Sequence, residues 1–193
     1  MKIIGITGPT GAGKTTALNA LTSLGACIID ADAVYHRLLT ESAPLRGALT
    51  ARFGDICDAD GGIDRKKLGE VVFTDPAALA PRFVGEAIGQ LLAGAEDSGC
   101  PAAAIDAIAL IESGLGTRCD TIVGIIAPAE VRVRRIMARE GISEAYARKR
   151  VSAQKGEDFF RANCGYILEN TEDDTPETFG ARALVLFTEI LDR

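Results

Sequence analysis

The residues best suited to chemistry lie close together near the N-terminus. Residues 8–15 read Gly-Pro-Thr-Gly-Ala-Gly-Lys-Thr and match the phosphate-binding pattern G-x-x-x-x-G-K-[ST] without a gap. Glycines let a chain turn tightly, so that successive backbone N–H groups face phosphate oxygens. The helix expected from Lys14 adds the positive end of its dipole. This stretch therefore predicts that the chain binds a nucleoside triphosphate, although the motif alone does not specify the reaction that follows.

Within this loop, each residue type has its own expected role. Lys14 carries a point charge that can reach the β- and γ-phosphates, and the Thr15 hydroxyl is suited to coordinate Mg²⁺. Thr16 adds a second hydroxyl near the α-phosphate. ATP and Mg²⁺ are therefore the expected cofactors. The remaining loop residues expected to hold phosphates are Gly8, Gly11, Ala12 and Gly13.

Two carboxylates, Asp30 and Asp32, follow the second apolar run of the chain. Ligands of parallel sheets bind beyond the carboxyl ends of the strands, where a carboxylate can orient an acceptor hydroxyl, accept its proton or hold Mg²⁺ through water. The alternative is that these residues cap a helix, because Asp is favoured at that position. The two interpretations are compatible, and both stay open at this point.

A basic segment stands out in an otherwise acidic chain. Residues 130–155 hold eight Lys and Arg against three acidic residues, whereas the whole chain has a net charge of −6. The planar fork of Arg binds two phosphate oxygens at once, so an Arg-rich helical pair is typical of a lid that closes over ATP and excludes water. The alternative is an ordinary solvated helix face. The candidates for phosphate contact are Arg135, Arg139 and Arg150.

The pattern of apolar runs predicts the elements that position these residues. Short, continuously apolar runs are typical of strands buried on both faces of a parallel sheet. Such runs span residues 3–6, 27–29, 102–105 and 122–126. Helical spacing of apolar residues lies between them, which predicts an α/β fold with helices on both faces of the sheet.

Helix boundaries and one long insertion complete this outline. Residues 33–99 read as mostly helical and are too long for a simple crossover, so we expect an inserted helical subdomain. Gly141 is expected to end the first Arg-rich helix, and Ser143 to cap the second. Thr175 and Pro176 are expected to begin a last helix that runs to about Leu191.

Composition excludes several classes of function. A length of 193 residues favours one domain, and the acidic charge argues against general binding to nucleic acid or a membrane surface. No run approaches the roughly 18 apolar residues of a membrane span. The five cysteines are widely spaced, which favours reduced thiols in a cytoplasmic protein over disulfides or a zinc site. The single histidine, His36, cannot build a His-rich metal site.

Other nucleotide-binding classes lack their signatures here. The guanine motif Asn-Lys-x-Asp of GTPases and the Ser-Gly-Gly signature of transporter ATPases are both absent from the sequence. Asp58-x-x-Gly61 fits a GTPase pattern but follows a turn-like stretch, so we interpret it as a chance match. By elimination, a kinase acting on a small molecule is favoured.

An ordered set of motifs then makes the interpretation more specific. The set comprises Ile4–Gly8, Leu24–Ala26, Ile29–Asp32, Phe53-Gly54, Asp60-Gly61, Ile63–Arg65 with Leu68, Val72-Phe73, Asp106 with Leu110, Glu112–Gly114, Arg135–Arg139, Arg150 and Gln154. In this order the chain resembles the dephospho-CoA kinase family over nearly its whole length. It departs from that family by lacking a His-Pro pair in residues 83–88, by having Ile108 where Pro is usual and by reading Asn170-Thr171-Glu172 in place of Asn-Asn-Gly.

The resemblance implies a three-layer P-loop kinase fold with a five-stranded parallel sheet, a helical acceptor-binding insertion and a helical lid. The expected core comprises residues 1–32, 100–128 and 162–193, the acceptor subdomain residues 33–99 and the lid residues 129–161. The implied reaction is transfer of the ATP γ-phosphoryl group to the ribose 3′-hydroxyl of dephospho-CoA, the last step of coenzyme A biosynthesis. A monomer or weak homo-oligomer is expected.

The resemblance also implies roles for individual residues. Asp32 would orient or deprotonate the hydroxyl, and Arg139, with Arg135 and Arg150, would neutralise the transferring group. Arg65 and Asp106 would position the acceptor or the metal. Two alternatives remain: a P-loop kinase for another small hydroxyl metabolite, such as shikimate or gluconate, and a nucleotide-gated binding protein that transfers no phosphate.

Overall fold

A computed structural model describes residues 1–54, 56, 63–64, 67 and 80–193 of the chain. The chain divides into two compact units, one made of residues 1–29 and 94–193 and the other of residues 30–93. Each unit is described by itself below. The predicted division into core, acceptor subdomain and lid remains a prediction.

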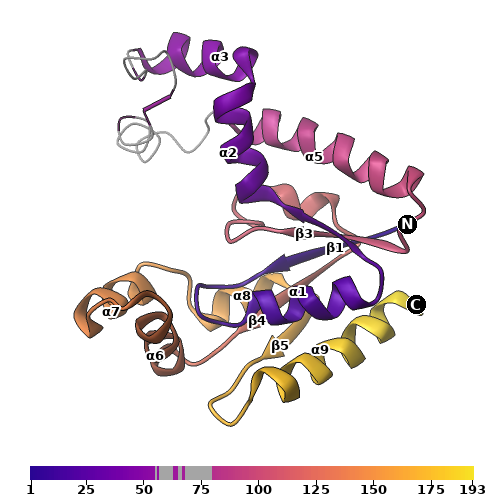
Figure 1. Cartoon of the computed structure of the whole chain (residues 1–193), viewed down its shortest axis with the longest axis vertical. Coiled ribbons are helices and arrows are strands. Elements are labelled where there is room, and N and C mark those ends of the chain that lie inside the picture. The colour runs from indigo at the N-terminus through magenta and orange to yellow at the C-terminus, as the bar shows by residue number, and fades with distance from the viewer. Residues whose placement is uncertain (55, 57–62, 65–66, 68–79) are drawn as a thin grey trace. The chain divides into compact units, whose positions relative to one another are not determined.

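The first unit is built on a parallel sheet with the strand order β2-β3-β1-β4-β5 (Figure 1). In that sheet β1 pairs in parallel with β3 and β4, and β4 pairs in parallel with β5. The strands are β1 (Lys2–Thr7), β2 (Cys27–Asp30), β3 (Ala102–Asp106), β4 (Thr121–Ile126) and β5 (Tyr166–Glu169). The expected α/β fold and its five-stranded sheet are thus confirmed. The apolar pattern by itself missed β5, because this strand has only Ile167 and Leu168 as aliphatic residues.

Helices of the first unit cover the sheet and extend from its carboxyl end. They are α1 (Lys14–Ser23), η1 (Leu115–Arg118), α6 (Ala129–Glu140), α7 (Glu144–Ser152), α8 (Glu157–Asn163) and α9 (Pro176–Leu191). The capping predictions are confirmed. Gly141 ends α6 with a φ of 65°, Ser143 caps α7, and Thr175 caps α9 by a reciprocal pair of hydrogen bonds with Thr178.

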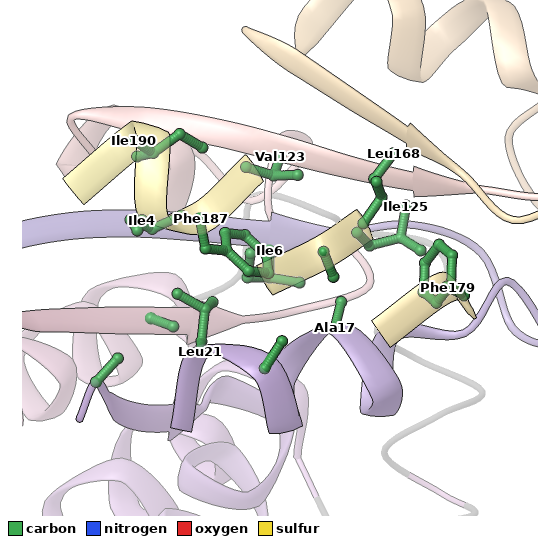
Figure 2. Close-up of a cluster of buried hydrophobic side chains, with 14 of the residues drawn as sticks. Ile4, Ile6, Ala17, Leu21, Val123, Ile125, Leu168, Phe179, Phe187 and Ile190 are labelled. Carbon is green, nitrogen blue, oxygen red and sulfur yellow. The ribbon is translucent and has the colours of Figure 1, made fainter. Parts of the chain in front are cut away.

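The main core lies between the sheet and the helices α1 and α9, which pack side by side (Figure 2). Ile4 and Ile6 of β1 face this layer together with Leu21 and Phe187, and all four side chains are fully buried. Side chains alternate along a strand, so Gly5 faces the opposite layer. A Cβ there would lie 2.6 Å from Leu110, so only glycine lets that layer pack closely on β1.

The cysteine prediction is wrong for one pair. Cys27 and Cys100 form a disulfide, with their Cα atoms 6.2 Å apart. Cys27 begins β2 and Cys100 stands two residues before β3; because β2 and β3 are neighbours, the two residues meet at one edge of the sheet. A sequence separation of 73 residues hides this proximity. Cys119 and Cys164 are free, and partial burial raises the pKa of each thiol to about 11.

The second unit is helical in its described part. It contains α2 (Ala31–Glu41), α3 (Ala43–Phe53) and most of α5 (Ala80–Asp97). Leu39, Leu45, Leu49 and Ile56 form its small buried core. Several sequence motifs lie outside the described residues: Asp58-x-x-Gly61, Asp60-Gly61, Arg65, Leu68 and Val72-Phe73. Among the helices that the structure describes, none has the length and apolar character needed to cross a membrane.

Candidate functional site

The predicted phosphate loop connects β1 to α1 and turns on three glycines. Gly8, Gly11 and Gly13 have φ values of 143°, 82° and 104°, a region that residues with side chains rarely adopt. Space is also limiting, because a Cβ at Gly8 would lie 2.0 Å from the Ile125 carbonyl oxygen and one at Gly13 2.3 Å from Asn170 Nδ2. The glycine spacing of the motif is therefore required by the fold itself.

A cavity of about 450 Å³ opens beside this loop. It brings the predicted loop residues Lys14 and Thr15 together with the predicted arginines of α6 and α7, so the first turn of α1 and the Arg-rich helices share one site. The lining residues are Pro9, Thr10, Gly11, Gly13, Lys14, Thr15, Ile108, Arg135, Arg139 and Arg150. The described lining includes four cationic side chains and no carboxylate, which suits a polyanionic ligand.

Glu140, which the sequence analysis counted only as a charge, holds two of these arginines. Its Oε1 accepts a hydrogen bond from Arg139 Nη2 at 2.5 Å, and its Oε2 accepts one from Arg150 Nη1. These bonds hold the pKa of Glu140 below its usual value. A single carboxylate at the end of α6 therefore keeps the two guanidinium groups together at the cavity.

Arg135 also lines the cavity, but it binds protein groups as well. Its guanidinium donates to the carbonyl oxygen of Gly11 at 3.4 Å, to Asn170 Oδ1 at 2.9 Å and to the carbonyl oxygen of Thr171 at 3.2 Å. Burial lowers the pKa of Arg135. This arginine thus ties α6 to both the phosphate loop and the segment after β5, and its contact with phosphate stays a prediction.

Asn170 is a site residue that sequence reasoning treated only as a departure from a family motif. Its side chain is 6% exposed, and its Nδ2 donates to the carbonyl oxygen of Ala12 at 2.9 Å. The position directly after β5, at the carboxyl edge of the sheet, was the available signal. Because the apolar pattern missed β5, the sequence alone did not reveal that Asn170 lies at this edge of the sheet.

The other predicted residues occupy different places. Asp30 caps α2 by accepting the Ala33 N–H at 2.9 Å, which confirms the capping interpretation for this residue. Asp32 lies exposed in the first turn of α2; both aspartates belong to the second unit, and their catalytic role stays a prediction. Asp106 is half-buried at the end of β3, opposite Ile6 of β1. Gly8 and Ala12 are buried, and Thr16 is half-buried in α1.

Comparison with known proteins identifies the family. A family model described as dephospho-CoA kinase matches residues 2–175. The dephospho-CoA kinase of Thermobifida fusca is 32% identical over 198 residues, which cover 98% of this chain and 96% of that protein. The dephospho-CoA kinase of Geobacter sulfurreducens is 35% identical over 189 residues, covering 94% and 95% of the two chains. The chain belongs to the dephospho-CoA kinase family.

A solved structure matches the chain over nearly its whole length. TT1252 from Thermus thermophilus superposes with a TM-score of 0.80 at 31% identity, and the match covers 98% of this chain and 97% of that one. The part of the chain matched by the dephospho-CoA kinase model includes the phosphate loop, the cavity arginines and Asn170. The resemblance drawn from ordered motifs is thereby confirmed.

Proposed function

We propose that this chain transfers the γ-phosphoryl group of ATP to the ribose 3′-hydroxyl of dephospho-CoA. The observation that carries the proposal is the cavity in which Lys14 and Thr15 of the phosphate loop meet Arg135, Arg139 and Arg150 in a member of the dephospho-CoA kinase family. The family uses ATP, so the polyphosphate is expected to occupy this cavity. Membership of the family also supports dephospho-CoA as the acceptor.

Phosphate binding rests on charge and on backbone geometry. Lys14 begins α1, so the Lys14 ammonium group and the positive end of the helix dipole act on the same ligand. Arg139 and Arg150 would then neutralise the charge of the γ-phosphoryl group. In phosphoryl transfer most of the rate comes from such positioning and electrostatic stabilisation, because the transition state needs little covalent help.

The residues also fit a magnesium ion delivered with ATP. Mg²⁺ keeps several waters and is usually bound by substrate phosphates and one or two protein oxygens. The Thr15 hydroxyl lines the cavity and would be such an oxygen. The described residues hold no group of three or more His, Cys, Asp or Glu side chains suited to a metal. When bound, this ion would neutralise charge on the phosphate oxygens.

The transfer step itself needs an oriented acceptor. The 3′-oxygen forms a bond to the γ-phosphorus, the bond from that phosphorus to the β–γ bridging oxygen breaks, and ADP leaves. The hydroxyl proton would pass to the carboxylate of Asp32, which would also orient the hydroxyl. Arg65 and Asp106 would help to position the acceptor or the metal. The helical residues 33–99 would supply the acceptor site, and residues 129–161 the lid.

An assay of ADP release against a panel of acceptors tests the proposal. The panel contains dephospho-CoA, shikimate, gluconate and a sample without acceptor, each with ATP and Mg²⁺. We expect ADP release to be stimulated by dephospho-CoA alone, with coenzyme A as the second product. Stimulation by shikimate or gluconate instead would assign another small-molecule kinase, and ATP binding without any stimulated release would indicate a nucleotide-gated binding protein.

A further inference from the structure

Three consecutive carbonyl oxygens of the phosphate loop are held by side chains from other elements. The Thr10 oxygen accepts from Arg132 Nε at 2.9 Å, the Gly11 oxygen from Arg135 Nη1 at 3.4 Å and the Ala12 oxygen from Asn170 Nδ2 at 2.9 Å. Two of these donors lie on α6 and one follows β5. The shape of the loop therefore depends on groups well outside the motif that defines it.

Of these three loop residues, Thr10 makes the most hydrogen bonds with side chains from other elements. Its backbone N–H donates to Gln154 Oε1 at 3.1 Å, and its hydroxyl accepts from Gln154 Nε2 at 3.0 Å. With the bond from Arg132 to its carbonyl oxygen, the N–H, hydroxyl and C=O groups of this residue are all engaged. The side chains of Gln154 and Arg132 hold Thr10 on both its backbone and its side-chain groups.

Arg132 and Gln154 also bind each other, and their surroundings make that bond important. Arg132 Nη2 donates to Gln154 Oε1 at 2.6 Å. Arg132 is only 4% exposed, and burial lowers its pKa. A buried guanidinium is tolerated only where hydrogen-bond acceptors replace the lost water, so the removal of Gln154 would be costly. The three residues form one partly buried polar network.

This network joins the loop to both ends of a helical hairpin. Arg132 lies near the start of α6, and Gln154 stands two residues after the end of α7. Gly11 packs on the same helix, because a Cβ there would lie 3.1 Å from the Arg132 carbonyl oxygen. Arg139 and Arg150, which line the cavity, lie on the hairpin between these two attachment points.

We propose that Arg132 and Gln154 are positioning residues for phosphoryl transfer from ATP: they fix the phosphate loop at Thr10 and, through the same contacts, set where the α6–α7 hairpin places Arg139 and Arg150. Neither side chain is required to touch the substrate. The inference rests on the proposed function for the identity of the nucleotide and is independent of the identity of the acceptor.

The substitution Gln154→Ala tests this inference directly. We expect the Kd for ATP with Mg²⁺, measured by calorimetry without acceptor, to rise by about tenfold, since hydrogen bonds to Thr10 and to a charged group are lost together. The KM for ATP should rise in parallel, while the KM for dephospho-CoA stays within about twofold of the parent value. A variant that is merely less stable would lose active protein and leave both KM values unchanged.

Arg148→Ala is the matched control. Arg148 also joins the two helices of the hairpin, through Glu130 at the start of α6 and Glu144 at the start of α7, but its bonds lie on the surface and involve no loop residue. We expect its Kd for ATP to stay within about twofold of the parent value. A rise equal to that of Gln154→Ala would overturn the inference, because general loosening of the hairpin would then explain both variants.

Thr10→Val keeps the inference testable if Gln154→Ala does not fold. It removes only the hydroxyl of a half-exposed residue and should raise the Kd for ATP by about threefold. Combined with Gln154→Ala it should add little, because both changes remove the same contact. An unchanged Kd in both single variants overturns the inference. A parent protein that binds ATP but ignores dephospho-CoA overturns the proposed function alone, because the calorimetric test uses no acceptor.

Discussion

Asp30 and Asp32 differ in their surroundings at the start of α2. The Asp30 carboxylate is occupied as the helix cap, where it accepts the N–H of Ala33. Asp32, two residues further on, presents an exposed carboxylate. The sequence analysis left capping and catalysis open for both residues. The observed cap confirms the capping role of Asp30, and Asp32 is the residue for which the family resemblance implies the role of base.

The substitution Asp32→Asn therefore tests catalysis separately from binding. The amide keeps the size of the side chain but cannot accept a proton, so we expect kcat to fall by about 10²–10⁴-fold. The Kd for ATP should stay close to the parent value. Steady-state kinetics with dephospho-CoA, together with calorimetry for ATP, measure the two quantities. A kcat near that of the parent protein would remove Asp32 from the catalytic role.

Glu140 leads to a prediction about pH. Its hydrogen bonds from Arg139 and Arg150 lower its pKa in the folded protein below the ordinary value of 4.5. A lowered pKa means that the stabilisation is fully present above the unfolded-state pKa and is lost as the pH falls through the folded-state pKa. We expect Glu140→Gln to lower Tm slightly at about pH 7 and to lower it less at about pH 3, since exposed ion pairs contribute little.

Thermal unfolding at the two pH values measures this effect. Glu172→Gln serves as the control, because Glu172 pairs with Arg134 on the surface, and neither of these residues is among those that line the cavity. The control should leave the KM for ATP unchanged, whereas Glu140→Gln should alter it by releasing two cavity arginines. The same decrease in Tm for Glu140→Gln at both pH values would contradict the assignment of these ion pairs.

At the level of elements, the phosphate loop shows how steric limits protect a functional shape. Gly13 precedes α1 with a φ of 104°, and a Cβ there would lie 2.3 Å from Asn170 Nδ2. Asn170 cannot move away easily, because it also binds Ala12 and Arg135. We expect Gly13→Ala to weaken ATP binding by at least about tenfold, since both the strained φ and the clash must be relieved by moving the loop.

The substitution Gly114→Ala separates the effect of a strained φ from the effect of a steric clash. Gly114 also has a positive φ, 76°, but a Cβ there would meet nothing within 4 Å. The control should cost about 1 kcal/mol of stability through its backbone conformation and leave the Kd for ATP unchanged. Calorimetry with ATP and thermal unfolding of both variants provide the comparison. Equal ATP affinity for the two variants would show that the contact with Asn170 does not control the loop.

For the whole molecule, features that depend on residues close together in the sequence were predicted correctly, whereas contacts between distant segments were not. Local signals were reliable: the apolar runs became β1 to β4, and the caps at Ser143 and Thr175 are in place because capping depends on a few neighbouring residues. Lys14, Thr15 and the three arginines were recognised by residue type and share one cavity. The contacts that join distant segments were not foreseen.

Those missed contacts share one physical cause. The disulfide between Cys27 and Cys100, the bond from Asn170 to Ala12 and the bonds from Gln154 to Thr10 link residues 73, 158 and 144 positions apart. Strand order brings each pair together, and no single segment encodes that order. For the same reason Arg132 was counted only as one charge of the basic segment, although its guanidinium is buried against the phosphate loop.

The two-unit organisation leads to a prediction about ligand-induced stability. The described residues that line the cavity proposed for ATP belong to the first unit, whereas the acceptor is expected to bind within residues 33–99. A ligand at about 100 times its Kd stabilises a folded protein by about 2.7 kcal/mol, which corresponds to a rise in Tm of roughly 5–10 °C for a chain of this size. We expect ATP with Mg²⁺ and dephospho-CoA each to raise Tm in the parent protein.

Lys14→Ala should separate these two responses. Removing the ammonium group from the cavity should abolish the rise in Tm with ATP, because its charge acts directly on the phosphates. The rise with dephospho-CoA should persist, since the acceptor is expected to contact other residues. Thermal unfolding of both proteins with each ligand alone measures the four values. Loss of both responses in Lys14→Ala would mean that the two ligands depend on the same residues, and the assignment of residues 33–99 to the acceptor would then be wrong.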